Sequence, residues 1–104
     1  MELVTYPIDL SGADFHAYAA RSLASANEVS QTDGMARLGD ILYAMSQAAG
    51  GLLTLAYQRY RAASSAGGVF ELEETKLMLG FLQSAGICTD KEVEAVINNW
   101  PQRC

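Results

Sequence analysis

Apolar residues recur at alternating steps of three and four through the middle of the chain. The positions are Met35, Leu38, Leu42, Met45, Ala49, Leu52 and Ala56. This spacing is the a/d pattern of a heptad, which is typical of a helix that packs along a seam. A second stripe widens the apolar face and consists of Ile41, Ala44, Ala48 and Leu55. Together the two stripes predict one long central helix that begins at Thr32 or Asp33 and ends at Ala63.

Two adjacent glycines, Gly50 and Gly51, lie in the middle of this predicted helix. Each glycine costs a helix interior about 1 kcal/mol relative to alanine. Two interpretations stay open from the sequence. Either the pair kinks the helix, or it lets another helix approach closely, since the neighbouring side chains are also small.

A shorter helix is predicted before the central one. It begins at Ser11, where Asp14 follows three residues later, as in a capping box. Its buried face has helical spacing and comprises Phe15, Tyr18, Ala19, Ser22, Leu23 and Ala26. The pattern fades over residues 27–30, and the run SQTDG at 30–34 has the composition of a turn.

Two more helices are predicted after the central one. The first spans residues 71–85, and Gly86 is placed to close it in a Schellman motif. The second begins with a capping box made by Thr89 and Glu92, and Pro101 ends it. Because only a few residues separate these helices, we expect them to form an antiparallel hairpin.

The two ends of the chain lack helical periodicity. Residues 1–10 form an extended arm or a short edge strand, for which no partner strand is evident in a sequence that is helical elsewhere. Residues 101–104 form a short tail. The sequence therefore predicts a single all-α domain over residues 1–104. Its expected architecture is a small bundle of about four helices with a long central helix and a C-terminal helical hairpin.

Composition limits the classes of partner. Of the 104 residues, 50% are hydrophobic and only 18% are charged, which favours burial of surface beyond one monomer and predicts a homo-oligomer or a protein partner. The formal charge of −5 excludes a typical nucleic-acid or anionic-membrane binder and suits a partner with a basic surface. The uncharged stretch at 41–58 is interrupted by polar residues and two glycines, namely Ser46, Gln47, Gly50, Gly51, Thr54 and Gln58. We therefore expect a buried helix and no membrane span.

The two cysteines, Cys88 and Cys104, are too few for the disulfide framework of a small secreted domain. Glu2 stands where a signal peptide carries positive charge. We therefore expect a reducing, cytoplasmic location. An intermolecular disulfide through Cys104 stays open.

Few side chains in the sequence are candidates for catalysis or metal binding. His16 is the single histidine, and Asp14 at i−2 points away from it on a helix, so it is expected to be an ordinary surface or half-buried side chain. Cys88 is interpreted as a small hydrophobe before a helix rather than as a nucleophile. The acidic residues Glu71, Glu73 and Glu74 suit the first turn of a helix. We expect no catalytic residues, no metal site and no cofactor.

The run AYQRYR at 56–61 has two interpretations. Tyr and Arg are enriched at interface hot spots, but tyrosines at the end of a helix also cover a core with their hydroxyls in water. The interface candidates combine this run with the heptad stripe: Leu38, Leu42, Met45, Ala49, Leu52, Tyr57, Tyr60 and Arg61.

The predicted function is a non-enzymatic protein-binding module, such as an adaptor, regulatory subunit or dedicated chaperone, that acts through an apolar helical face. An acidic inhibitor or immunity-type protein that blocks a basic site on a toxin or enzyme is the alternative, motivated by the negative charge and small size. A self-assembling structural subunit of a secretion apparatus is a third hypothesis, and an enzyme comes last.

Overall fold

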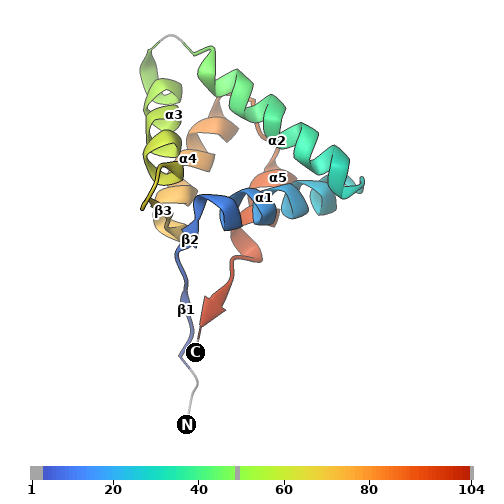
Figure 1. The fold of residues 1–104 in the computed structure, drawn as a ribbon. Coiled ribbons are helices and arrows are strands. Elements are labelled where there is room, and N and C mark those ends of the chain that lie inside the picture. The colour runs from blue at the N-terminus through green and yellow to red at the C-terminus, as the bar shows by residue number, and fades with distance from the viewer. Residues whose placement is uncertain (1–3, 49, 104) are drawn as a thin grey trace.

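The computed structural model describes residues 4–48 and 50–103. Within these residues the chain forms five helices: α1 (Gly12–Asn27), α2 (Gln31–Ser46), α3 (Gly51–Ser64), α4 (Leu72–Ser84) and α5 (Asp90–Asn98). Four strands of two residues each accompany them: β1 (Tyr6–Pro7), β2 (Leu10–Ser11), β3 (Val69–Phe70) and β4 (Gln102–Arg103). The protein is thus mostly helical, as predicted (Figure 1).

The prediction of one long central helix is wrong. The predicted segment contains two helices, α2 and α3, which diverge sharply at the connection between them (Figure 1). Gly50 and Gly51 have φ angles of 89° and 75°, which the interior of a right-handed helix cannot contain. Gly50 is instead the N-cap of α3, and Gly51 is its first residue. No described atom lies within 4 Å of a Cβ built on either glycine, so the pair neither kinks a continuous helix nor marks a close contact. It separates two helices instead.

The predicted turn at 30–34 is also wrong, because it forms the first turn of α2. Ser30 has extended backbone angles, and its Oγ accepts a hydrogen bond from the Asp33 backbone N–H at 3.1 Å. Ser30 is therefore the N-cap, in place of the predicted Thr32 or Asp33. The preceding helix α1 ends at Asn27, and its C-cap residue Glu28 adopts a left-handed conformation with a φ angle of 55°.

The other helix ends follow their sequence signals. Ser11 Oγ accepts from the Asp14 N–H at 3.2 Å and caps α1. Thr89 caps α5 in a complete capping box with Glu92. Helix α4 closes in a Schellman motif, since the Gly86 N–H donates to the Gln83 carbonyl and the next N–H to the carbonyl at position 82.

The N-terminal arm does have partner strands, contrary to the sequence expectation. β1 pairs antiparallel with β4 near the C-terminus, and β2 pairs antiparallel with β3. The first and last described segments consequently lie side by side (Figure 1). Trp100 reinforces this closure, because its Nε1–H donates to the Ile8 backbone carbonyl at 2.7 Å.

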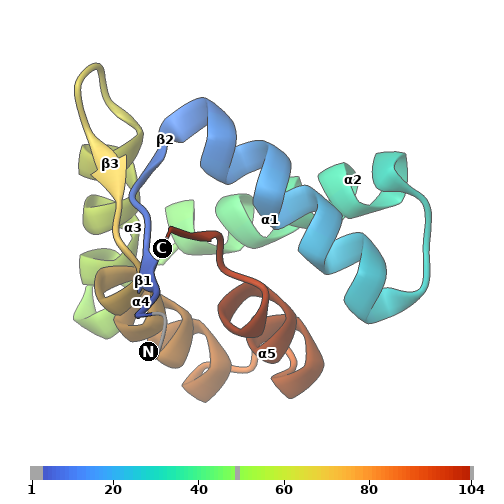
Figure 2. The same ribbon diagram turned by 90° about the horizontal axis from the view of Figure 1, so that it is seen from below.

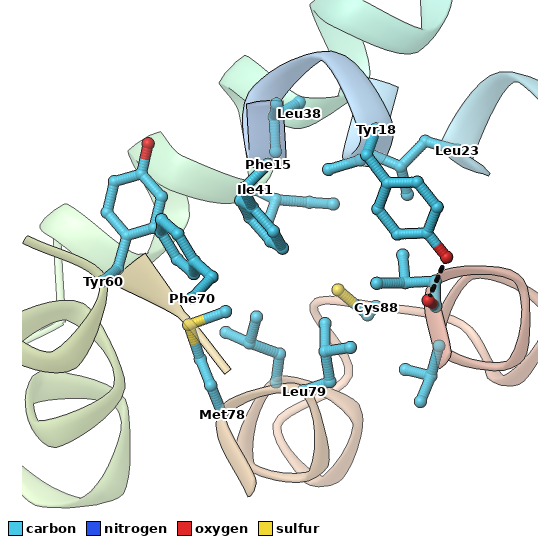
Figure 3. Close-up of a cluster of buried hydrophobic side chains, with 14 of the residues drawn as sticks. Phe15, Tyr18, Leu23, Leu38, Ile41, Tyr60, Phe70, Met78, Leu79 and Cys88 are labelled. Atoms are coloured by element: carbon cyan, nitrogen blue, oxygen red, sulfur yellow. Dashed lines mark hydrogen bonds between the residues drawn. The ribbon is translucent and has the colours of Figure 1, made fainter. Parts of the chain in front are cut away.

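Helix α1 holds the centre of the molecule. It packs on α2 and on α5 (Figure 2), and its residues Phe15 and Tyr18 enter the core (Figure 3). Phe15 stacks on Phe70 of β3 with ring centroids 3.9 Å apart, and the Tyr18 hydroxyl donates to the Val96 carbonyl of α5. α5 packs more extensively on α1 than on α4, so the two C-terminal helices are not a self-contained hairpin.

A close helix contact does exist, but at Gly34. A Cβ at this position would lie 2.3 Å from the carbonyl oxygen of Ala20 and 2.8 Å from the Cβ of Ala24. Only glycine therefore lets α2 cross α1 at this distance. The contact thus determines how closely α2 packs on α1.

Candidate functional site

Three of the predicted interface residues belong to the protein's own core. Leu38, Met45 and Tyr60 have exposed fractions of 8%, 1% and 8%. Together with the partly buried Leu42 they line an interior cavity of about 30 Å³ beneath α2. A cavity of this size holds about one water at most, and its lining is apolar. These side chains stabilise the fold.

The remaining candidates do not share one surface. Leu52 and Arg61 are exposed on α3, whereas Tyr57 is partly buried against the core. The Arg61 guanidinium lies over the Tyr57 ring, 5.9 Å from its centroid. Ala49 lies outside the described residues. The heptad stripe is thus divided between two helices, and no continuous seam runs along it.

The residues with potential for chemistry have structural neighbours. His16 is half-buried, and its Nε2 forms a hydrogen bond with the Tyr60 hydroxyl, which links α1 to α3. Cys88 is buried, and burial raises the pKa of its thiol to about 11, which disfavours the thiolate needed by a nucleophile. Among the described residues, no group of three or more His, Cys, Asp or Glu side chains is placed to hold a metal ion.

A hollow on the surface lies between α3, β3 and α4 and has a volume of about 330 Å³. We call it the α3–α4 groove. Its lining comprises Arg59, Ala62, Ala63, Gly68, Val69, Phe70, Glu71, Glu74, Thr75 and Met78. Most of these side chains are apolar, and the charged ones come from α3 and from the start of α4.

The groove owes its shape to the glycine turn before β3. Gly67 has a φ angle of 81°, which favours glycine. Gly68 follows, and a Cβ there would lie 2.5 Å from the Ala62 carbonyl oxygen and 2.6 Å from that of Ala63. The chain can therefore pass directly over the end of α3 and place Val69 and Phe70 beside α4. The composition of residues 64–68 by itself indicates no more than a flexible loop.

Charged side chains stand around this apolar surface. Arg59 on α3 forms an ion pair with Glu74 on α4, so the pair joins the two sides of the groove. Glu71 is the N-cap residue of α4, and no side-chain capping hydrogen bond is described for it. With one cation and two carboxylates among its lining residues, the groove carries a net negative charge.

Thr75 also lines the groove, and its side chain is unusual. The residue is only 2% exposed. Its Oγ1 is buried and, among the described residues, has no hydrogen-bond partner. A buried hydroxyl without a partner costs about 1–3 kcal/mol. The groove therefore contains a local destabilising feature next to its apolar floor.

A polar cluster of Asn27, Arg37 and Glu92 lies elsewhere, where α1, α2 and α5 meet. Glu92 is buried at its centre, Arg37 is half-buried and Asn27 is exposed. The Glu92 carboxylate is 1% exposed and receives the Arg37 guanidinium in two hydrogen bonds of 2.7 and 2.9 Å. Asn27 Nδ2 donates to the same carboxylate at 2.9 Å. The Arg37 hydrogen bonds lower the pKa of Glu92 to about 2, against the opposing effect of burial.

The sequence identified Glu92 only as a helix cap. Its partner Arg37 lies 55 residues away on α2, in the segment whose start was predicted wrongly. Arg37 also donates to the Ile87 carbonyl at 2.6 Å, which ties α2 to the loop before α5. Because the hydrogen bonds of this cluster join α1, α2 and α5, we assign it a structural role.

Comparison with known proteins gives no match to any protein-family model, to any curated protein or to any solved structure. The described part of the chain also contains no helix that is both long and apolar enough to cross a membrane.

Proposed function

We propose that this protein is a non-enzymatic protein-binding module, acting as an adaptor, a regulatory subunit or a dedicated chaperone through an apolar helical surface. The α3–α4 groove carries this proposal. Its volume of about 330 Å³ is roughly ten times the share of one water molecule, and Val69, Phe70 and Met78 give it an apolar floor. An apolar hollow of this kind can receive an apolar anchor side chain of another protein.

The placement of the reactive groups supports binding rather than catalysis. His16 is engaged with Tyr60, and the thiol of Cys88 is buried among core residues. A nucleophile needs a base within hydrogen-bond reach and access to substrate. Neither side chain lines the groove. We propose a cytoplasmic location on the composition of the chain alone.

An acidic inhibitor is the second candidate function. The formal charge of −5 and the carboxylates of Glu71 and Glu74 at the groove favour a basic target. For such a protein the association rate with its target should fall steeply as salt is added. A rate that does not depend on salt would favour the adaptor or chaperone instead.

Self-association is proposed as a further property. Large apolar side chains are exposed at the junction of α2 and α3, with exposed fractions of 67% for Tyr43, 55% for Leu52 and 50% for Leu55. Burial of this surface between copies would account for them. Size-exclusion chromatography with light scattering, under reducing conditions, would detect such an oligomer.

Affinity capture with a blocked groove tests the proposed function. Ala62 is exposed and lines the groove, so Ala62→Trp should fill it without disturbing the core. Ala36→Trp is the matched control, because Ala36 is exposed on α2 and does not line the groove. We expect the tagged wild type and Ala36→Trp to retain the same partner from lysate at fixed stoichiometry, and Ala62→Trp to lose it. A monomeric protein that retains no partner would refute the proposal.

A further inference from the structure

We propose that the α3–α4 groove recognises a protein segment that combines an apolar side chain with a neighbouring basic one, and that Arg59 occupies the place of this basic side chain in the free protein. The inference rests on the proposed function and specifies the chemistry of the partner. It follows from the floor of the groove, from its charges and from the ion pair that joins its two sides.

The floor defines the apolar part of the partner. Phe70 is 3% exposed and Met78 is 5% exposed, so both are anchored in the core and present little more than their edges to the groove. Val69 is 45% exposed beside them. A rigid apolar floor with one exposed aliphatic side chain favours an aliphatic or aromatic anchor, because burial of apolar surface drives such contacts.

The charges define the polar part of the partner. Glu71 and Glu74 both line the groove, and Arg59 is the one basic residue among the described lining residues. The surplus negative charge agrees with that of the whole chain. An acidic segment would be repelled here, whereas a basic segment gains a complementary contact with Glu71 and Glu74.

The ion pair between Arg59 and Glu74 indicates where the basic side chain binds. Arg59 extends from α3 to a carboxylate on α4 and combines an aliphatic stem with a cationic end, which is the chemistry expected of the partner. Both side chains are about half exposed, at 46% and 56%. An exposed pair of this kind contributes little stability, so a basic residue of the partner can replace Arg59 at low cost.

Two substitutions that break the same ion pair distinguish this inference from a purely structural role. Arg59→Gln frees Glu74 for the partner, whereas Glu74→Gln removes the carboxylate that the partner needs. We expect binding to become about two- to fivefold tighter with Arg59→Gln and about two- to fivefold weaker with Glu74→Gln, as for a single exposed ion pair. A structural role for the pair predicts changes of the same sign in both variants.

The probe is a random peptide library displayed on phage and selected against the full chain. We expect the selected peptides to be enriched in Lys or Arg beside Leu, Ile, Val or Phe. The affinity of a selected peptide is then measured by titration against wild type, Arg59→Gln and Glu74→Gln. Glu94→Gln on α5 is the matched control for loss of one exposed carboxylate and should leave the affinity unchanged, since Glu94 does not line the groove.

The outcomes separate this inference from the proposed function. Peptides without basic residues, or equal affinities for Arg59→Gln and Glu74→Gln, would overturn the inference while leaving a protein-binding role intact. Tighter binding by Glu74→Gln would indicate an acidic partner and would overturn it as well. If neither the library nor the affinity capture yields a binder, the proposed function fails together with the inference.

Discussion

At the scale of single residues, Glu92 joins three helices through one carboxylate. It caps α5 locally, because its Oε1 accepts the Thr89 N–H at 2.9 Å. The same carboxylate receives Arg37 from α2 and Asn27 from α1. A buried carboxylate without these donors would be strongly destabilising, so the cluster must stay complete for the charge to be tolerated.

The stability of the protein should therefore fall in acid in a way that depends on Glu92. Its folded pKa of about 2 lies below the ordinary value of 4.5. A lowered folded pKa gives stability that is present above the unfolded pKa and is lost as the pH falls from about 4.5 through about 2. We expect Glu92→Gln to lower the free energy of unfolding by about 2–3 kcal/mol near neutral pH. Urea unfolding at several pH values measures this difference.

The pH dependence of the difference is the decisive observation. Protonated Glu92 resembles glutamine, so wild type and Glu92→Gln should converge in stability as the pH approaches 2. The same change at exposed Glu94 should leave stability within about 0.5 kcal/mol of wild type. A difference between wild type and Glu92→Gln that stays constant with pH would show that the carboxylate is not charged in the folded state.

A second residue-scale prediction concerns Thr75. Thr75→Val replaces the unpaired buried hydroxyl with a methyl group of similar shape and should raise the free energy of unfolding by about 1 kcal/mol. Thr89→Val is the matched control with the opposite sign, because the Thr89 hydroxyl accepts the Glu92 N–H at 3.2 Å and its loss should cost about 1 kcal/mol. Thermal unfolding of both variants measures the two changes in stability. A stability loss in Thr75→Val would show that its hydroxyl has a partner in solution.

Residue-scale sequence signals succeeded where the partners are near in the chain. Ser11, Thr89 and Gly86 were identified because each satisfies backbone groups within a few residues. Arg37 and Thr75 were not, because an ion pair over 55 residues and a missing hydrogen bond leave no local pattern. The groove was missed for the same reason, since its lining comes from three elements.

At the scale of secondary-structure elements, the connection between α2 and α3 determines the architecture. The heptad spacing continues across residues 47–50, so periodicity alone favoured one helix. The positive φ angles of Gly50 and Gly51 override it, and Thr54 Oγ1 accepts the Gly50 N–H at 2.7 Å to begin α3. Apolar residues on both sides of the break can thus face the same core from two directions.

The sign of the stability change caused by Gly51→Ala tests whether α2 and α3 are separate helices. In a continuous helix Gly51→Ala would raise stability by about 1 kcal/mol. With the observed φ of 75° we expect it to lower stability by about 1–2 kcal/mol, because alanine is strained in the left-handed region. Chemical denaturation followed by far-ultraviolet circular dichroism measures the change.

Gly39 supplies the control for this test. It lies within α2, and no described atom is within 4 Å of a Cβ placed there. Gly39→Ala should therefore raise stability by about 0.5–1 kcal/mol. Stabilisation by both changes would show that α2 and α3 form one helix in solution.

At the scale of the whole molecule, the chain closes on itself through Trp100. This residue is 3% exposed and lies near Phe15 and Tyr18 of α1. Its hydrogen bond to Ile8 fixes the N-terminal segment against the end of α5. All-α character was predictable from periodicity, but this closure was not, because strands of two residues carry no alternation that a sequence could reveal.

Deletion of residues 1–8 should therefore change the environment of Trp100 while the helices remain. We expect the fluorescence emission of Trp100 to shift to longer wavelength and the free energy of unfolding to fall by about 1–2 kcal/mol. The reason is the loss of two hydrogen bonds, one from Trp100 Nε1–H to the Ile8 carbonyl and one from the Ile8 N–H to the Pro101 carbonyl. Deletion of residues 102–104 is the control, because it removes β4 but keeps the Ile8 bond to Trp100. An unchanged emission spectrum after the first deletion would contradict the closure.

The pairing of β1 with β4 also determines how the molecule responds to mechanical load. Tyr6 lies opposite Arg103 and Pro7 opposite Gln102, so the chain enters and leaves at the same end of the ladder. Tension applied to the two ends acts across the strands, and their hydrogen bonds break one after another instead of together. The ladder should therefore open at low force, and the helical body should bear the load only after the ladder has opened.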